Sequence, residues 1–184
     1  ATFESNETTG KYLISLPSGK NYGLIVRKDE YLFHSENFNI SDSAAYQEVV
    51  KDICMKKIEV GSVIVLKNIF YDYNKSSLRD ASKNELDRLN KLLNENPTLK
   101  IELSAHTDSR GSDSYNQKLS QKRAQTCVDY LIKGGIAPER LVTKGYGETQ
   151  LIKSDEDIAK LTFEEDKENA HQENRRTEFK IIEK

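Results

Sequence analysis

The sequence predicts an α+β fold in which helices cover one side of a mixed β-sheet, preceded by a small, partial all-β segment. Two observations predict it. No helical periodicity is present before residue 74. From Ser62 onward, strand and helix patterns alternate in the order β-α-β-α-β-β. We therefore expect two domains, residues 1–57 and residues 58–184.

Length and charge exclude several classes of protein. The 184 residues suit one ordinary domain with a small companion. The 28 Lys and Arg residues balance 30 Asp and Glu residues, which argues against a nucleic-acid partner because phosphate binding requires a basic face. No run approaches the roughly 18 apolar residues that span a bilayer. Residues 1–10 lack the pattern of a signal peptide, so we expect any secretion signal to have been removed or to lie upstream.

Short runs of strand-forming residues predict the all-β segment. Turn signals separate these runs at residues 17–20 and 29–30. The expected strands cover residues 11–16, residues 21–28, a stretch that begins at Tyr31, and residues 48–55.

The second domain shows the helical and strand patterns more clearly. The nearly continuous apolar run Val63–Leu66 predicts a strand covered on both faces. Leu86, Leu89 and Leu93 recur at helical spacing and predict a helix over residues 82–94. Further strands are expected at 99–105, 140–143 and 176–182, a long helix at 115–133, and an irregular acidic stretch at 154–174 with one short helix near 158–161.

A polar loop between the second strand and the long helix carries the candidate binding site. The loop presents Asp108, and Asn116 and Arg123 share one face of the helix that follows. Arg123 lies two turns into this helix and can lean back toward the loop. A carboxylate and a guanidinium beside a helix N-terminus suit a zwitterion, because they bind its ammonium and its carboxylate respectively.

The same segment, residues 104–124, resembles the signature of the OmpA-like peptidoglycan-binding domain. In that signature a His-Thr-Asp loop precedes a helix that begins Tyr-Asn-x-x-Leu-Ser-x-x-Arg-Ala. Residues 68–73 (NIFYDY), 145–148 (GYGE) and 174–176 (NRR) match the flanking pieces in the same order. Ala105 stands where the family commonly has Gly, a change that adds only a methyl group.

This resemblance implies non-covalent binding of the peptidoglycan stem peptide through its diaminopimelate residue. It implies an anchor that ties an outer-membrane protein or envelope complex to the cell wall, in the periplasm at the outer membrane, without catalysis, cofactor or metal. By position, Asp108 and Arg123 are expected to hold the amino-acid end of the ligand. Further hydrogen bonds are expected from Thr107 and Asn116, and pocket walls from Tyr71, Asp72, Asn174 and Arg175.

Residues 9–28 resemble the back half of a carboxypeptidase-regulatory-like β-sandwich. The matching pieces are residues 9–12, 17–20 and 22–28, whereas Glu30 replaces a usual Gly and the opening strands of the sandwich are absent. The combination of the two parts is similar to large envelope proteins of the Bacteroidetes type, some of which serve secretion machinery. It implies contacts with other envelope proteins through this segment or through upstream domains.

Alternative interpretations remain open for the candidate residues. Ser104, His106 and Asp108 alternate as in a hydrolase triad, but they lie in a row and lack the glycines of a nucleophile elbow. Calcium binding by residues 108–113 is disfavoured by Arg110 in the middle of the loop. Without the signature, Asp108 would be a loop cap and Arg123 a structural ion-pair partner. A protein–protein adaptor is the third alternative.

The two cysteines do not form a metal motif. Cys127 falls in an apolar helical stripe, which favours a small buried thiol. A disulfide with Cys54 is possible but not required by the sequence.

Overall fold

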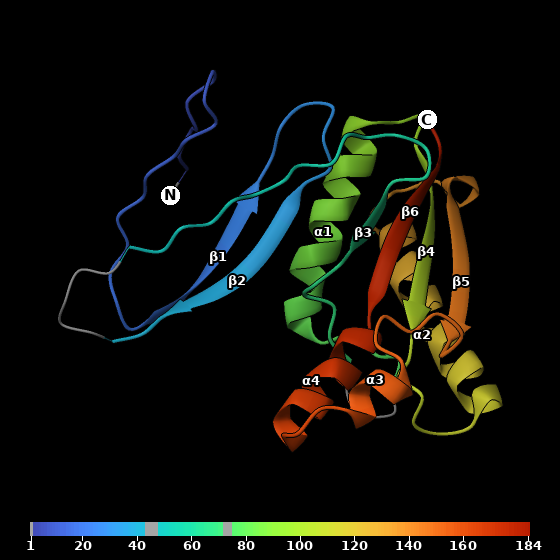
Figure 1. Ribbon diagram of the computed structural model, residues 1–184. Coiled ribbons are helices and arrows are strands. Elements are labelled where there is room, and N and C mark those ends of the chain that lie inside the picture. The colour runs from blue at the N-terminus through green and yellow to red at the C-terminus, as the bar shows by residue number, and fades with distance from the viewer. Residues whose placement is uncertain (1, 43–47, 72–74) are drawn as a thin grey trace. The chain divides into compact units, whose positions relative to one another are not determined.

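The computed structural model describes residues 2–42, 48–71 and 75–184, and the chain divides into two compact units (Figure 1). The first unit comprises Ala1–Val26 and His34–Cys54, and the second comprises Arg27–Phe33 and Met55–Lys184. We expected the boundary after residue 57, and the last part of the second unit begins at Met55. However, the short segment Arg27–Phe33 belongs to the second unit.

A two-stranded antiparallel sheet forms the regular part of the first unit. Strand β1 (Lys20–Val26) pairs with β2 (His34–Ile40), and the Tyr22 and Phe38 rings lie 5.9 Å apart across the ladder. The strands expected at residues 11–16 and 48–55 were wrong, since the structure assigns no strand there. Strand-forming composition is not sufficient without a ladder partner, and Leu13 in the first of these stretches is 85% exposed. The larger β-sandwich stays a prediction.

The second unit contains a four-stranded mixed sheet with helices, which confirms the α+β fold. The sheet order is β3-β6-β4-β5, with β4 and β5 parallel and the other pairs antiparallel. The strands are β3 (Val63–Val65), β4 (Lys100–His106), β5 (Leu141–Gly147) and β6 (Thr177–Glu183). The α-helices are α1 (Asp80–Glu95), α2 (Asp113–Lys133), α3 (Asp155–Ala159) and α4 (Glu164–Asn174), and a 3-10 turn spans Pro138–Arg140.

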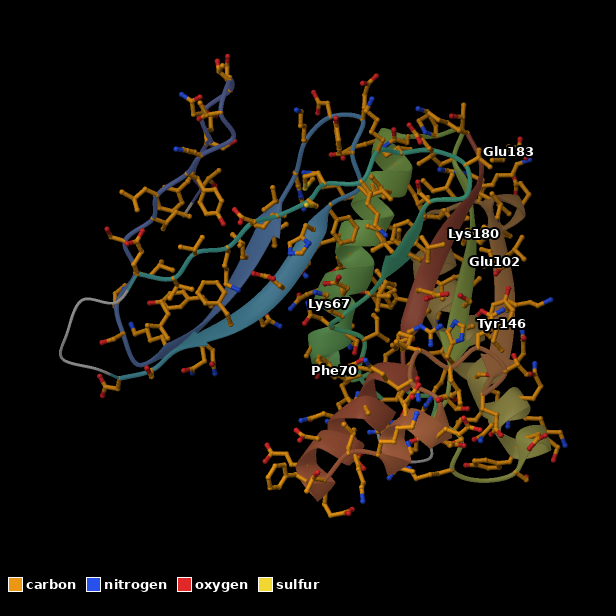
Figure 2. All side chains as sticks on the ribbon, in the orientation of Figure 1. Lys67, Phe70, Glu102, Tyr146, Lys180 and Glu183 are labelled. Carbon is orange, nitrogen blue, oxygen red and sulfur yellow. The ribbon has the colours of Figure 1, made fainter. Side chains whose placement is uncertain are left out.

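The core lies between one face of this sheet and helices α1 and α2. Leu103 of β4 is opposite Phe179 of β6 in the ladder, and both side chains are fully buried. The helices add Leu86, Leu89, Leu93, Ala124, Cys127, Val128 and Leu131 to the same cluster. Because strand side chains alternate, Glu102, Tyr146 and Lys180 project from the opposite face (Figure 2).

Two expectations for this unit were wrong in detail. Val63–Val65 is an edge strand rather than one covered on both faces, and Val65 is 39% exposed. The acidic stretch expected to be irregular forms α3 and the three-turn helix α4. Apolar periodicity did not reveal α4 because only Ala170 and Asn174 are buried along it.

Helix α2 packs against β5 at very short range. A Cβ atom at Gly145 would lie 2.3 Å from the backbone nitrogen of Gln121, so a side chain at this position would push the helix away. The absence of a side chain also permits direct bonds: Gln121 Oε1 accepts from Gly145 N at 2.7 Å, and Gln117 Nε2 donates to Gly145 O at 2.7 Å. These contacts fix the position of α2 along the sheet.

The segment Arg27–Phe33 contributes to the core of the second unit. Leu32 and Phe33 are buried in the same cluster as the sheet and helix residues. The backbone of Leu32 donates to Lys56 O at 2.8 Å, and Ile58 donates to Glu30 O at 2.8 Å. A segment that precedes β2 in sequence therefore supports the domain that follows β2.

We predict that Leu32→Ala lowers the free energy of unfolding of the second unit by about 2–5 kcal/mol, the usual cost of such a cavity. Leu13→Ala is the matched control, and we expect it to change stability by less than about 0.5 kcal/mol because Leu13 is exposed. Urea unfolding of the full chain measures both. Equal effects of the two substitutions would show that Leu32 is not part of this core.

Candidate functional site

The candidate site lies at the end of the sheet where β4 and β5 finish. The start of α2, the helices α3 and α4, and the start of β6 meet at the same end (Figure 1). Backbone bonds hold the polar loop here: His106 N donates to Arg176 O at 2.9 Å, and Thr107 N donates to Gly147 O at 2.8 Å. Asp108 therefore extends from a strand end that is bonded on both sides.

Asn116 on the first turn of α2 holds the loop in shape. Its amide nitrogen donates to the carbonyl oxygens of Asp108 and Arg110, both at 3.3 Å, and to the Glu148 carboxylate at 2.5 Å. Gly111 completes the turn with a φ of +118°, a conformation that side-chain-bearing residues rarely adopt. Asn116 therefore braces the loop, and its expected hydrogen bond to a ligand stays a prediction.

The Asp108 carboxylate is buried and pairs with two arginines. Its Oδ2 accepts from Arg175 Nη1 at 2.5 Å and from Arg110 Nη2 and Nε at 2.7 and 2.9 Å. Both arginines also bind Glu168 of α4: Arg110 Nη1 lies 2.9 Å from Oε2, and Arg175 Nη2 lies 2.6 Å from Oε1. The four side chains form one network, here called the Asp108 clasp.

This network keeps both carboxylates ionised. Burial by itself would raise the pKa of Asp108, but hydrogen bonds from Arg110 and Arg175 outweigh burial and lower it. Hydrogen bonds from Arg110 and then from Arg175 lower the pKa of Glu168 from 4.5 to about 2. The Asp108 clasp is therefore fully charged at neutral pH.

Arg123 reaches the same end of the sheet but does not pair with Asp108. Its Nε donates to the carbonyl oxygen of Lys75 at 3.1 Å, and its guanidinium carbon lies 4.7 Å from the Tyr71 ring centre. Burial lowers the pKa of this guanidinium. Among the residues that the structure describes, none accepts a hydrogen bond from either Nη atom of Arg123. These amino groups are free to bind a carboxylate.

The remaining expected site residues have different surroundings. Thr107 is buried, and its hydroxyl has no hydrogen-bond partner within the described part of the chain. Tyr71 lies beneath Arg123, with its hydroxyl 3.2 Å from both Thr177 Oγ1 and Cys127 Sγ. Asn174, expected as a pocket wall, is fully buried and braces the chain at Ile152 and Lys153. Asp72 lies outside the described residues.

Sequence reasoning missed Arg110 and Glu168 as members of the site. Arg110 carried a signal, since it follows Asp108 by two residues in a loop tight enough to fold back on itself. Glu168 carried no such signal, because it lies in an acidic stretch 58 residues after Arg110. Only the position of α4 brings it to the loop.

The residues of the open alternatives have other partners. His106 Nε2 lies 3.1 Å from Glu178 Oε1, and its ring stacks on Tyr146 at 5.1 Å, so it contacts neither Ser104 nor Asp108 as a triad base would. No group of three His, Cys, Asp or Glu residues in the described part of the chain is arranged to hold a metal ion.

Cys54 and Cys127 are both free thiols, and burial raises the pKa of Cys127 to about 12. No helix of the described chain is long and apolar enough to span a membrane.

The lowered pKa of Glu168 predicts a stability change in acid. Its contribution to stability is complete above its unfolded pKa of 4.5 and is lost as the pH falls toward 2. We therefore expect Glu168→Gln to unfold with a weaker pH dependence than the wild type between about pH 4.5 and 2.

Urea unfolding midpoints across this pH range measure the effect. Glu165→Gln is the control, because Glu165 is exposed on the same helix. If the unfolding midpoint of Glu168→Gln depends on pH in the same way as the midpoints of the wild type and this control, Glu168 does not pair within the Asp108 clasp.

Comparisons with known proteins agree with this architecture. The sequence model of the OmpA family matches residues 70–162. Outer membrane porin F of Pseudomonas fluorescens is 39% identical over 85 residues, which are 46% of this chain and 26% of that protein. Outer membrane protein A of Salmonella typhi is 40% identical over 87 residues, which are 46% of this chain and 25% of that protein. The chain thus spans about a quarter of the length of these relatives.

Solved structures share the fold of the second unit. The peptidoglycan-associated lipoprotein of Burkholderia pseudomallei aligns with a TM-score of 0.50 and 21% identity, covering 63% of this chain and 88% of that one. The cell wall anchor of the type VI secretion system of Pseudomonas aeruginosa aligns with a TM-score of 0.50 and 25% identity, covering 66% and 80%. On the family match, which extends over half of its residues, this chain belongs to the OmpA family.

Proposed function

We propose that the second unit binds the peptidoglycan stem peptide non-covalently, through its diaminopimelate residue. The observation that carries this proposal is a buried acid and a partly unpaired guanidinium at one end of the sheet, Asp108 and Arg123. Two structural neighbours are described as a peptidoglycan-associated lipoprotein and as a cell wall anchor, which supports the same class of ligand.

The charged and polar groups of the site match the ends of an amino acid. The two Nη atoms of Arg123 have no acceptor within the described chain and present the paired donors that a carboxylate accepts. The Thr107 hydroxyl is a second unsatisfied group, buried beside Asp108. Asp108 supplies the negative charge that an ammonium requires. The site thus suits the zwitterionic end of diaminopimelate.

In this proposal the protein is an anchor and not an enzyme. It works in the periplasm and ties an outer-membrane protein or an envelope complex to the cell wall. Outer-membrane proteins among the relatives support this location. Contacts with other envelope proteins are assigned to the first unit, where both strands of the described sheet are edge strands, the kind that a further strand can pair with. A secretion machinery is one such assembly.

Binding to insoluble murein sacculi tests the proposal. We expect Asp108→Asn and Arg123→Ala each to weaken sedimentation with sacculi by about tenfold or more, since a charge-assisted hydrogen bond contributes roughly 1.5–3 kcal/mol. Asp166→Asn is the matched control, because Asp166 is exposed on α4 and outside the Asp108 clasp. Thermal melts must show that each variant is folded. Undiminished sedimentation of the folded double variant would remove this site from consideration.

The proposal also predicts discrimination between two kinds of peptidoglycan. Lysine lacks the extra carboxylate of diaminopimelate, so Arg123 would have no anion to bind. We expect a lysine-type stem peptide to bind more weakly than the diaminopimelate type by about tenfold or more, the cost of one charge-assisted bond. Isothermal titration calorimetry with the two soluble peptides measures the difference. Equal affinities would mean that the site reads another part of the stem.

A further inference from the structure

Asp108 is already occupied by a cation of the protein itself. Three side-chain donors of the described chain, Arg110 Nε, Arg110 Nη2 and Arg175 Nη1, reach its carboxylate, and all three bind the oxygen Oδ2. The other oxygen, Oδ1, accepts a long backbone bond of 3.3 Å from Arg110 N and no further bond from the residues that the structure describes. The Asp108 side chain is 8% exposed. An incoming ammonium therefore meets Arg110 or Arg175 at the oxygen that it would bind.

The two arginines differ in how firmly they are held. Arg175 is 23% exposed and bonds Gln172 as well as Glu168 and Asp108. Arg110 is 53% exposed, and its remaining side-chain partner is Glu168, which is 54% exposed. An exposed side chain with few partners moves at lower cost than a buried one with several. Arg110 is thus the member of the clasp that can leave.

Glu168 provides a place for Arg110 when it leaves Asp108. The carboxylate of Glu168 already accepts from Arg110 Nη1 at 2.9 Å and from Nη2 at 3.3 Å. These bonds come from the Nη1 and Nη2 atoms of the guanidinium, whereas Nε donates to Asp108. Rotation of the Arg110 side chain can therefore break its bonds to Asp108 while its charge stays paired with α4.

We infer that Arg110 is an internal competitor of the ligand: it occupies the ammonium position on Asp108 and transfers to Glu168 when the ligand binds. This inference rests on the proposed function and adds a specificity device to it. A ligand must carry a cationic group to displace Arg110. A ligand that carries a carboxylate but no cationic group leaves Arg110 bound to Asp108.

The inference predicts that Arg110→Ala tightens binding. Removing an exposed ion-pair competitor of this kind should raise the affinity by about 1.5- to fivefold. The probe is a soluble diaminopimelate-containing stem tripeptide, titrated calorimetrically into the full chain. Lys118→Ala is the control, because it removes the same charge from an exposed position on α2 with no contact to the Asp108 clasp.

A double-mutant cycle with Glu168→Gln tests the second half of the inference. In the wild-type background, Glu168→Gln should weaken binding, since Arg110 loses its alternative partner. In the Arg110→Ala background the same substitution should have a smaller effect, which then reports only on Arg175. The Arg110 Nε resonance in 15N NMR, assigned by its loss in Arg110→Ala, should shift when the peptide is added to the wild type.

The outcomes separate this inference from the proposed function. If the wild type does not bind the peptide, both are overturned. If the wild type binds and Arg110→Ala binds equally well or more weakly, the inference alone fails. Weaker binding would show that Arg110 contacts the ligand directly, and equal binding would show that the ammonium binds the other oxygen of Asp108, Oδ1. An unshifted Arg110 resonance on peptide addition would also overturn the transfer to Glu168.

Discussion

The buried carboxylate of Asp108 is the constraint around which the site is organised. Removing a carboxylate from water is costly unless cations and hydrogen bonds surround it, and at the end of β4 Arg110 and Arg175 supply both. These arginines in turn bind Glu168, which attaches α4 to the loop. Since α4 buries little apolar surface, this charge network is a principal contact between that helix and the site.

A second constraint is the close approach of α2 to β5 at Gly145. It sets where the first turn of α2 lies, and therefore where Asn116 meets the loop and where Arg123 projects. Arg123 is held from the other side by the Tyr71 ring and the Lys75 carbonyl. The tyrosine hydroxyl is buried against Cys127 and Thr177, so the guanidinium rests on groups that belong to the core. Packing of the core thus keeps Arg123 in place, and its Nη atoms have no acceptor among the described residues.

The two ends of the candidate ligand would consequently meet environments of different rigidity. Arg123 lies on a helix packed against the sheet, whereas the cover of Asp108 is an exposed arginine side chain. A site of this kind binds an anion with little rearrangement but admits a cation only after an internal ion pair is broken. Arg110 is itself half exposed and keeps Glu168 as a partner, so the occupant of Asp108 is chosen by differences in affinity.

The sequence by itself determined the elements with strong local patterns, and it predicted Asp108 and Arg123 as candidate binding residues. Local patterns of this kind can be seen in a linear sequence because they follow which side chains are buried. Examples are the leucines at helical spacing in α1, the alternation in β4, and the short distance from the loop to α2. Tertiary structure alone decided that β3 is an edge strand, that Leu32 supports the second unit, that Asn174 is a buried brace, and that Glu168 joins Asp108. The physical reason is that an ion pair or a buried amide depends on which distant segments meet. Polar side chains on an exposed helix leave no periodic trace of the partner they will contact.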